Sequence, residues 1–200
     1  PPEASSAPLT IRTPMGGRRG YGPTHSQSLD KLLLGAPGLT VVAASHGALS
    51  VAMDNCRHQL VLCGPEAAAA SAMETLRAEG AICNVLPFDR AYHTPSFAAV
   101  SEAIRAFFST LTIAAPRIDL YSCVTAQPYP ADADEIRALA VSQWTRTVRF
   151  RETVSAMHEA GVRLFVEVGP RNTLTGFVDD ILHGTPYVAV ASNVRYRSGI

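Results

Sequence analysis

A histidine followed directly by Thr94-Pro95 is the feature of this sequence best suited to chemistry. His93 comes after an apolar run over 82–88 that predicts a strand. A helix is expected over 96–109, because apolar residues recur there at helical spacing and proline is tolerated in a first helical turn. At this junction an imidazole, which titrates near neutrality, can take a proton from a hydroxyl and return it. Position alone leaves open that His93 is a hydrogen-bonded structural residue.

The composition indicates a globular chain without a strongly charged partner. The 200 residues are 47% hydrophobic and carry a formal net charge of zero, so neither nucleic acid nor a membrane is expected as a partner. The four cysteines lack the paired spacing of metal ligands, and no signal peptide is recognised. No metal site, reduced thiols and a cytoplasmic location are therefore expected. The apolar runs are too short to span a bilayer.

The first quarter of the chain predicts a small α/β unit. Residues 1–8 are expected to be a linker, and a glycine-rich loop follows a short strand. The loop contains neither a Gly-Lys-Ser/Thr motif nor G-x-G-x-x-G, so it is not predicted to hold phosphates. The expected elements are a strand over 9–12, a helix over 28–34 and a strand over 39–43.

Ser26 is a weak candidate for a nucleophile. It sits in His25-Ser26-Gln27, which resembles the centre of a nucleophile elbow. The tight elbow turn requires glycines on both sides, but Thr24 and Ser28 occupy those positions. The flanking residues therefore count against this assignment.

The segment around His25 resembles a second type of enzyme. Residues 12–28, RTPMGGRRGYGPTHSQS, and residues 37–43, PGLTVVA, are similar to the β-subunit of thiamine-diphosphate-dependent 2-oxoacid dehydrogenases. This resemblance implies a dehydrogenase-like segment over 9–45, with His25 lining an active site close to thiamine diphosphate. The glutamate that activates the cofactor in that family has no counterpart here.

From residue 48 onward the chain resembles the C-terminal part of an acyltransferase domain of polyketide and fatty-acid synthases. The motifs that carry this resemblance are DNCRHQLVLCG over 54–64, the tetrad RAYH over 90–93, PRIDLYSCVT over 116–125 and FVEVGP over 165–170. The family is similar to malonyl-CoA:acyl-carrier-protein transacylases. The resemblance implies a ferredoxin-like small subdomain, in part, over 48–88, in which a strand, a strand, an amphipathic helix over 65–79 and a strand are expected. It also implies the C-terminal part of a hydrolase-like large subdomain, with an incomplete parallel sheet, over 89–200. A last helix is expected over 174–182.

The acyltransferase resemblance assigns roles to individual residues. His93 would be the catalytic base, and Arg90, Ala91 and Tyr92 would sort the substrate. The bulk of Tyr92 favours malonyl over α-branched groups. Asn55 and Gln59 would lie near the acyl group, although strand-edge hydrogen bonding explains them as well, and a solvated surface position explains Arg90. The strand over 116–125 would support His93, through the backbone carbonyl at Cys123.

Three functional hypotheses follow. The first is an acyltransferase fragment that moves a malonyl-type group from acyl-CoA to the phosphopantetheine thiol of an acyl carrier protein, with other synthase domains as further partners. It needs no bound cofactor, but the Gly-His-Ser-x-Gly nucleophile elbow is missing. The second is a fragment of a thiamine-dependent dehydrogenase β-subunit. The third is a non-catalytic remnant that binds a carrier protein or another partner.

Overall fold

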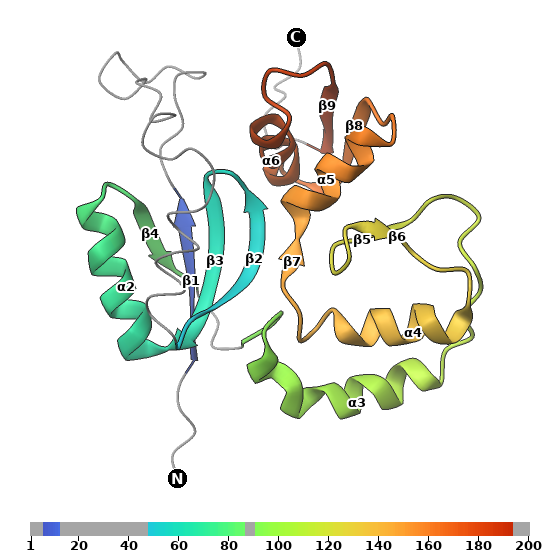
Figure 1. Cartoon of the computed structure of the whole chain (residues 1–200), viewed down its shortest axis with the longest axis horizontal. Coiled ribbons are helices and arrows are strands. Elements are labelled where there is room, and N and C mark those ends of the chain that lie inside the picture. Colours follow the sequence, from blue (N-terminus) through green and yellow to red (C-terminus); the bar gives the residue numbers. More distant parts are fainter. Residues whose placement is uncertain (1–5, 13–47, 87–90, 194–200) are drawn as a thin grey trace.

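The computed structural model describes residues 6–12, 48–86 and 91–193, which form an α/β fold of small sheets and helices (Figure 1). None of the helices in these ranges is long and apolar enough to cross a membrane. In chain order the elements are β1 (Ser6–Arg12), β2 (Ser50–Cys56), β3 (Gln59–Pro65), α2 (Glu66–Ala78), β4 (Ile82–Val85), the 3-10 turn η2 (Pro95–Phe97), α3 (Ala98–Ser109), β5 (Tyr121–Ser122), β6 (Gln127–Pro128), α4 (Ala133–Ser142), β7 (Val148–Arg149), α5 (Phe150–Glu159), β8 (Leu164–Pro170), α6 (Thr173–Ile181) and β9 (Val188–Asn193).

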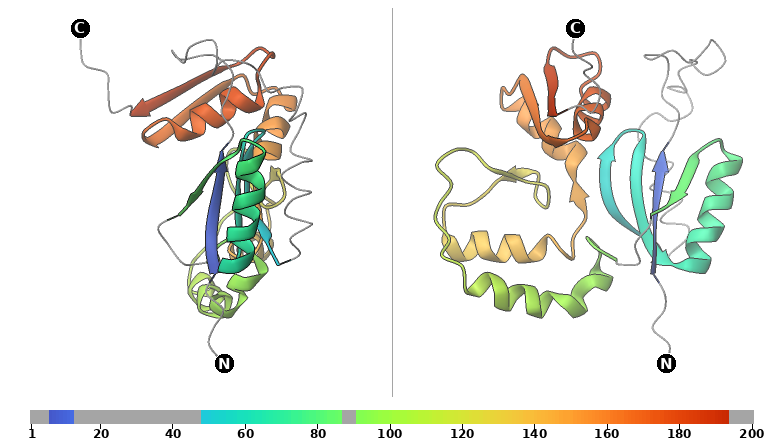
Figure 2. Two further views of the ribbon diagram at one scale, coloured as in Figure 1. Left: turned by 90° about the vertical axis from the view of Figure 1, so that its left-hand side faces the viewer. Right: turned by 180° about the vertical axis from the view of Figure 1, so that it is seen from behind.

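The first part of the chain, joined by β7 from further along, forms a five-stranded sheet in the order β4-β1-β3-β2-β7. Its strands are antiparallel except that β7 runs parallel to β2. Helix α2 covers one face, which the side view in Figure 2 shows. Leu60 and Leu62 of β3 are almost fully buried beneath it, against the apolar stripe of Ala69, Ala72 and Leu76. The strand, strand, helix, strand order predicted for 48–88 is confirmed.

Strand β1 corrects the expected division of the chain. The sequence predicts a linker over 1–8 and a separate segment over 9–45. In the structure, residues 6–12 form a single strand, which lies between β3 and β4. Its pairing with β3 runs from Ser6 opposite Pro65 to Arg12 opposite Gln59. Because its backbone is hydrogen-bonded on both sides, β1 is an inner strand of the same sheet as 48–88. The predicted helix over 28–34 and strand over 39–43 lie outside the described residues.

The second part of the chain places helices around two short sheets. The helix predicted over 96–109 is present as η2 and α3, and the predicted C-terminal helix is α6. The strand predicted over 116–125 is wrong in extent, because only β5 is a strand there and it pairs antiparallel with β6. Pro116 lacks a backbone donor, which disfavours a longer strand at this position.

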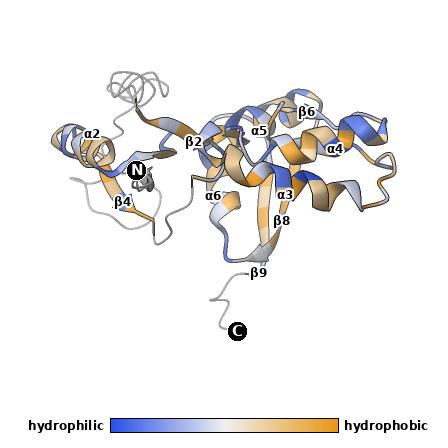
Figure 3. Ribbon diagram, turned by 90° about the horizontal axis from the view of Figure 1, so that it is seen from below, coloured by the Kyte–Doolittle hydropathy of each residue, from blue (hydrophilic) through white to orange (hydrophobic). Residues whose placement is uncertain are grey.

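The pair β8 and β9 is a parallel sheet with one bare face. Phe165 and Ala189 lie on the face that packs against α6. The alternate residues point away, and Val168 reaches 87% exposure. Within the described residues this sheet has two strands, in agreement with the incomplete parallel sheet that is expected. Its second face is exposed, although parallel sheets are usually covered on both faces. Figure 3 shows that β8 is predominantly hydrophobic. The exposed residues of this face, named the open face below, are Leu164, Val166, Val168, Val188 and Val190.

Two buried carboxylates join the five-stranded sheet to helices α5 and α6. Asp180 of α6, only 3% exposed, accepts hydrogen bonds from the backbone N–H of His58 and pairs with its Nδ1 at 2.5 Å. Burial disfavours ionisation of Asp180, but the hydrogen bonds from His58 and Cys56 outweigh it and hold the pKa of this carboxyl below its usual value. Asp54 of β2 binds Arg151 of α5 through one oxygen, at 2.7 and 3.0 Å, and burial raises its pKa.

The substitution Asp180→Asn tests this junction. The lowered pKa means that the ionised carboxylate stabilises the fold above the unfolded-state pKa, and this contribution is lost as the pH falls through the folded-state value. The variant should lose about 2 kcal/mol of unfolding free energy at neutral pH. The gap to the wild type should close below about pH 4. Denaturant titrations at several pH values measure both effects.

Asp179→Asn is the matched control, because Asp179 is exposed and its contact with Tyr187 survives as an amide. It should change the unfolding free energy by less than about 0.5 kcal/mol at every pH. Equal losses in the two variants, or a gap for Asp180→Asn that persists in acid, would contradict the role given to Asp180.

Candidate active site

His93 is held in an unusual backbone conformation just before η2. Its φ is +63°, in the left-handed region that non-glycine residues rarely adopt. Two hydrogen bonds to the end of α4 hold it there. The backbone N–H of His93 donates to the Trp144 carbonyl at 2.9 Å, and Nδ1 lies 2.7 Å from the Gln143 carbonyl oxygen. The histidine is therefore fixed by a turn that lies 50 residues further along the chain.

These contacts determine which imidazole nitrogen can act as a base. A carbonyl oxygen only accepts hydrogen bonds, so Nδ1 must carry the proton that it donates to Gln143. In the neutral ring the lone pair is then on Nε2, and no described residue hydrogen-bonds to this atom. The arrangement matches that of a general base whose other nitrogen is oriented by an acceptor.

Aromatic rings surround the histidine. Tyr92 lies 4.8 Å from Phe97 and 6.3 Å from Trp144, measured between ring centroids. Thr94 follows His93 and is only 1% exposed, and its hydroxyl donates to the Ala91 carbonyl at 2.7 Å. The N–H of Phe97 donates in turn to the Thr94 carbonyl, which starts η2. Packing and local hydrogen bonds thus define the path of the chain on both sides of His93.

The residues of the tetrad that are predicted to sort the substrate lie in different environments. Ala91 is buried in the core of the five-stranded sheet, with Ala52, Val61 and Cys63. Tyr92 belongs to the aromatic cluster next to His93. Arg90 lies outside the described residues, as do His25 and Ser26. Of the tetrad, the structure therefore shows Tyr92 beside the imidazole and Ala91 directed into the core.

The structure does not link Asn55 and Gln59 to His93. The Asn55 amide donates to the Gln59 side chain at 3.0 Å across the turn between β2 and β3, and Gln59 is buried. The same turn is held to α6 by His58 and Asp180. These contacts agree with the alternative interpretation of Asn55 and Gln59 as hydrogen-bonding residues of the strand ends. Their predicted role near the acyl group stays a prediction.

Gln143 and Trp144 are the site residues that sequence reasoning missed. The backbone carbonyl expected to support His93 was that of Cys123, but this carbonyl accepts from the N–H of Arg149 at 2.7 Å instead. Backbone carbonyls carry no signal in residue types, which explains the error. Trp144 had one signal, since it is the only tryptophan in the chain.

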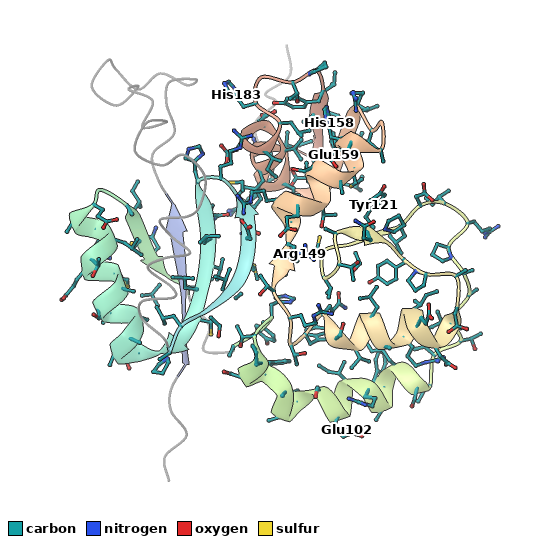
Figure 4. All side chains as sticks on the ribbon, in the orientation of Figure 1. Glu102, Tyr121, Arg149, His158, Glu159 and His183 are labelled. Carbon is teal, nitrogen blue, oxygen red and sulfur yellow. The ribbon has the colours of Figure 1, made fainter. Side chains whose placement is uncertain are left out.

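A surface hollow of about 440 Å³ lies apart from His93, between the β2–β3 turn, α5 and the loop before β6. It contains Arg57, Arg149 and Arg151. Figure 4 shows Arg149 on β7, the edge strand of the five-stranded sheet, on the side of β5–β6. Arg149 pairs with Glu152 and donates to two backbone carbonyls, and Arg151 pairs with Asp54. The charges of Arg149 and Arg151 are therefore paired within the protein.

Within 48–86 and 91–193, no group of three or more His, Cys, Asp or Glu side chains could hold a metal ion. The Cys56 thiol is buried beside the Asp180 carboxylate, and burial together with this carboxylate raises its pKa. It is therefore not an activated nucleophile. His93 remains the best candidate for chemistry in this part of the molecule.

The substitution Thr94→Val tests the hydrogen bond that shapes the segment around His93. It keeps the side-chain volume but leaves the Ala91 carbonyl without its buried donor, so the unfolding free energy should fall by about 1–2 kcal/mol. Thr110→Val is the matched control, because Thr110 makes the same contact three residues back, to Phe107, on the surface. Denaturant unfolding should show less than about 0.5 kcal/mol for the control. Equal effects would contradict a special role for Thr94.

Comparison with known proteins gives consistent matches. Residues 37–195 match the acyl transferase domain family. A polyunsaturated fatty acid synthase of Thraustochytrium sp. is 31% identical over 140 residues, which are 69% of this chain and 5% of that protein. The polyketide synthase GfsA of Streptomyces halstedii is 31% identical over 142 residues, 69% of this chain and 2% of that protein. The chain thus spans a small part of these relatives.

Solved structures show the same fold. The malonyl CoA-acyl carrier protein transacylase of Coxiella burnetii has a TM-score of 0.75 at 21% identity, covering 94% of this chain and 54% of that one. The acyl transferase domain of SpnD has a TM-score of 0.77 at 21% identity, covering 98% of this chain and 43% of that one. None of these matches supports the resemblance to thiamine-dependent dehydrogenases. The chain belongs to the acyl transferase domain family.

Proposed function

We propose that this chain is the part of an acyltransferase that supplies the general base, His93. It would serve the transfer of a malonyl-type group from acyl-CoA to the phosphopantetheine thiol of an acyl carrier protein. The observation that carries the proposal is the fixed imidazole, whose Nδ1–H donates to Gln143 and whose Nε2 accepts no bond from any described residue. The family match and the likeness to a malonyl transacylase support the reaction class.

The chemistry has two steps, and His93 handles one proton in each. A serine hydroxyl gives its proton to Nε2 while its oxygen attacks the thioester carbonyl. The tetrahedral intermediate collapses, the CoA thiolate leaves with that proton, and an acyl-serine remains. In the second step the carrier thiol gives its proton to Nε2 and attacks the acyl-serine, and the serine oxygen regains the proton as it leaves.

In this proposal the serine comes from polypeptide outside the described residues. No serine within 48–86 or 91–193 hydrogen-bonds to His93. The solved transacylase contains nearly twice the polypeptide that this chain matches. We therefore propose that the remainder of an acyltransferase fold, carrying the serine, packs against this chain.

The open face of β8 and β9 is the surface where the remainder would bind. Leu164 pairs with Val188 and Val166 with Val190, which places four aliphatic side chains together, each between 44% and 60% exposed. Burying such a surface is strongly favourable, and parallel strands ordinarily have both faces covered. The occupant that fits is a polypeptide with an aliphatic helix or strand face.

Two finer assignments belong to the proposal. The Tyr92 ring, packed on Phe97, fills space beside His93 and favours an unbranched malonyl group. A cytoplasmic location stays a prediction. The dehydrogenase alternative rests on residues outside the described ranges and gains no support from the comparisons.

The first test is intact-mass spectrometry after incubation with malonyl-CoA. The chain is mixed with the part of the Coxiella burnetii malonyl CoA-acyl carrier protein transacylase that lies outside the segment matched here. A malonyl adduct should form on the added polypeptide. With His93→Gln in this chain, its rate of formation should fall by about 100-fold or more, because the base is lost.

His183→Gln is the control, since His183 is exposed on the surface and should leave the rate unchanged (Figure 4). An adduct on this chain alone that disappears in Ser26→Ala would assign the nucleophile to Ser26 instead. An adduct unaffected by His93→Gln, or no adduct in any mixture, would contradict the proposal.

The second test places a charge on the open face. Val166→Lys should leave the chain as stable as the wild type, because the side chain is 53% exposed. It should weaken binding to the added polypeptide by about tenfold or more, because a charge would be buried in an apolar contact. Sedimentation of the mixture measures binding, and Ala160→Lys at the end of α5 is the surface control. Wild type that pairs with itself through this face would assign the face to a second copy instead.

A further inference from the structure

Trp144 contacts His93 through both its backbone and its side chain. Its carbonyl accepts the His93 N–H at 2.9 Å. Its indole lies nearly parallel to the imidazole, with 9° between the planes and 6.5 Å between the centroids. This is the geometry of an offset aromatic stack. The residue next to the one that receives the Nδ1 proton therefore also limits the tilt of the imidazole ring.

The indole is itself confined by other rings. Phe97 stacks on it at 6.2 Å, and Tyr92 lies 6.3 Å away. Phe97 is buried, so this side of the cluster cannot move without disturbing the start of α3. The indole Nε1 is buried and has no hydrogen-bond partner in the described part of the chain. A buried N–H without a partner costs free energy, so packing alone would be served as well by phenylalanine.

We propose that Trp144 is a positioning residue for His93. Its ring keeps the imidazole in the plane in which Nδ1–H donates to the Gln143 carbonyl, so that Nε2 faces outward with its lone pair. One hydrogen bond alone would permit the ring to tilt and to exchange tautomers, whereas a flat surface beside the ring removes that freedom. The inference deepens the proposed function, since it specifies how the base is oriented.

The direct test is the tautomer of His93 in the 200-residue chain. Long-range proton–nitrogen NMR correlations distinguish Nδ1–H from Nε2–H, and the signals lost in His93→Gln assign the residue. With the imidazole ring neutral, the wild type should show the Nδ1–H form. Trp144→Phe should keep this form, because a flat ring remains. Trp144→Leu should shift the ring towards Nε2–H, which free imidazole side chains prefer in water.

Phe107→Leu is the control, because Phe107 is an exposed aromatic residue on α3 whose ring contacts Phe108 rather than His93. It should leave the tautomer as in the wild type. The proposal is overturned if Trp144→Leu retains the Nδ1–H form, or if the wild type lacks it.

Tryptophan fluorescence provides an independent measurement. Trp144 is the chain's only tryptophan, so all indole emission reports on this site. Replacing His93 removes one of the rings described beside the indole. The emission of His93→Gln should therefore differ from that of the wild type, whereas His183→Gln should leave the emission unchanged. Equal emission from all three proteins would overturn the contact.

Both measurements use the chain by itself and need no transfer activity. If the NMR and fluorescence results are as expected but no malonyl transfer occurs in the mixture, the proposed function fails while the positioning role of Trp144 stands. If transfer occurs and Trp144→Leu changes neither the tautomer nor the rate, the positioning role fails and the proposed function stands.

Discussion

Two neighbouring backbone carbonyls at the end of α4 hold the segment on which the candidate site depends. They receive the N–H and the Nδ1–H of His93, and so connect the entry to α3 with the exit from α4. This connection explains how His93 keeps a left-handed backbone conformation that would otherwise be unfavourable. Because His93 precedes α3 and the two carbonyls follow α4, the packing of α3 against α4 also determines how the imidazole is oriented.

The other described elements form two parts, one sheet with a face covered by a helix and one with an exposed apolar face. The five-stranded sheet has a covered face beneath α2 and an inner strand, β1, contributed from the start of the chain. The β8–β9 pair has α6 on one side and bare aliphatic residues on the other. Buried carboxylates at Asp54 and Asp180 connect these parts. A chain organised in this way presents a fixed base before η2 and, separately, an exposed apolar surface on β8–β9, which is consistent with one portion of a larger acyltransferase fold.

The paired charges that stabilise the fold lie away from the candidate catalytic histidine. Of the charged groups with shifted pKa values, Asp54 and Asp180 have their partners where the five-stranded sheet meets α5 and α6, and Glu152 of α5 pairs with Arg149 at the end of β7. Glu167 of β8 accepts hydrogen bonds from Thr175 of α6. The surroundings of His93 contain backbone carbonyls and aromatic rings instead. A base surrounded by neutral groups is oriented by backbone dipoles and by packing. Here Tyr92, Phe97 and Trp144 provide the packing.

Residue types and their spacing were enough to predict most helices and the residue that carries the chemistry. Helical spacing predicted α2, α3 and α6, and the Thr-Pro pair after His93 marked the start of η2. These features are local, because hydrophobic period and capping residues act within a few positions. Sequence motifs also identified the family.

The pairing of distant segments was not predicted from the sequence. β1 was expected in a separate segment, whereas it is an inner strand of the five-stranded sheet. The carbonyl that supports His93 was expected at Cys123, whereas Gln143 holds the imidazole. Strand order and carbonyl direction follow from contacts between residues far apart in the chain, and backbone groups are the same in every residue type, so these features emerge only on folding. The bare face of β8 and β9 likewise appears only in the folded chain, because an aliphatic strand has the same sequence whether or not both of its faces are covered.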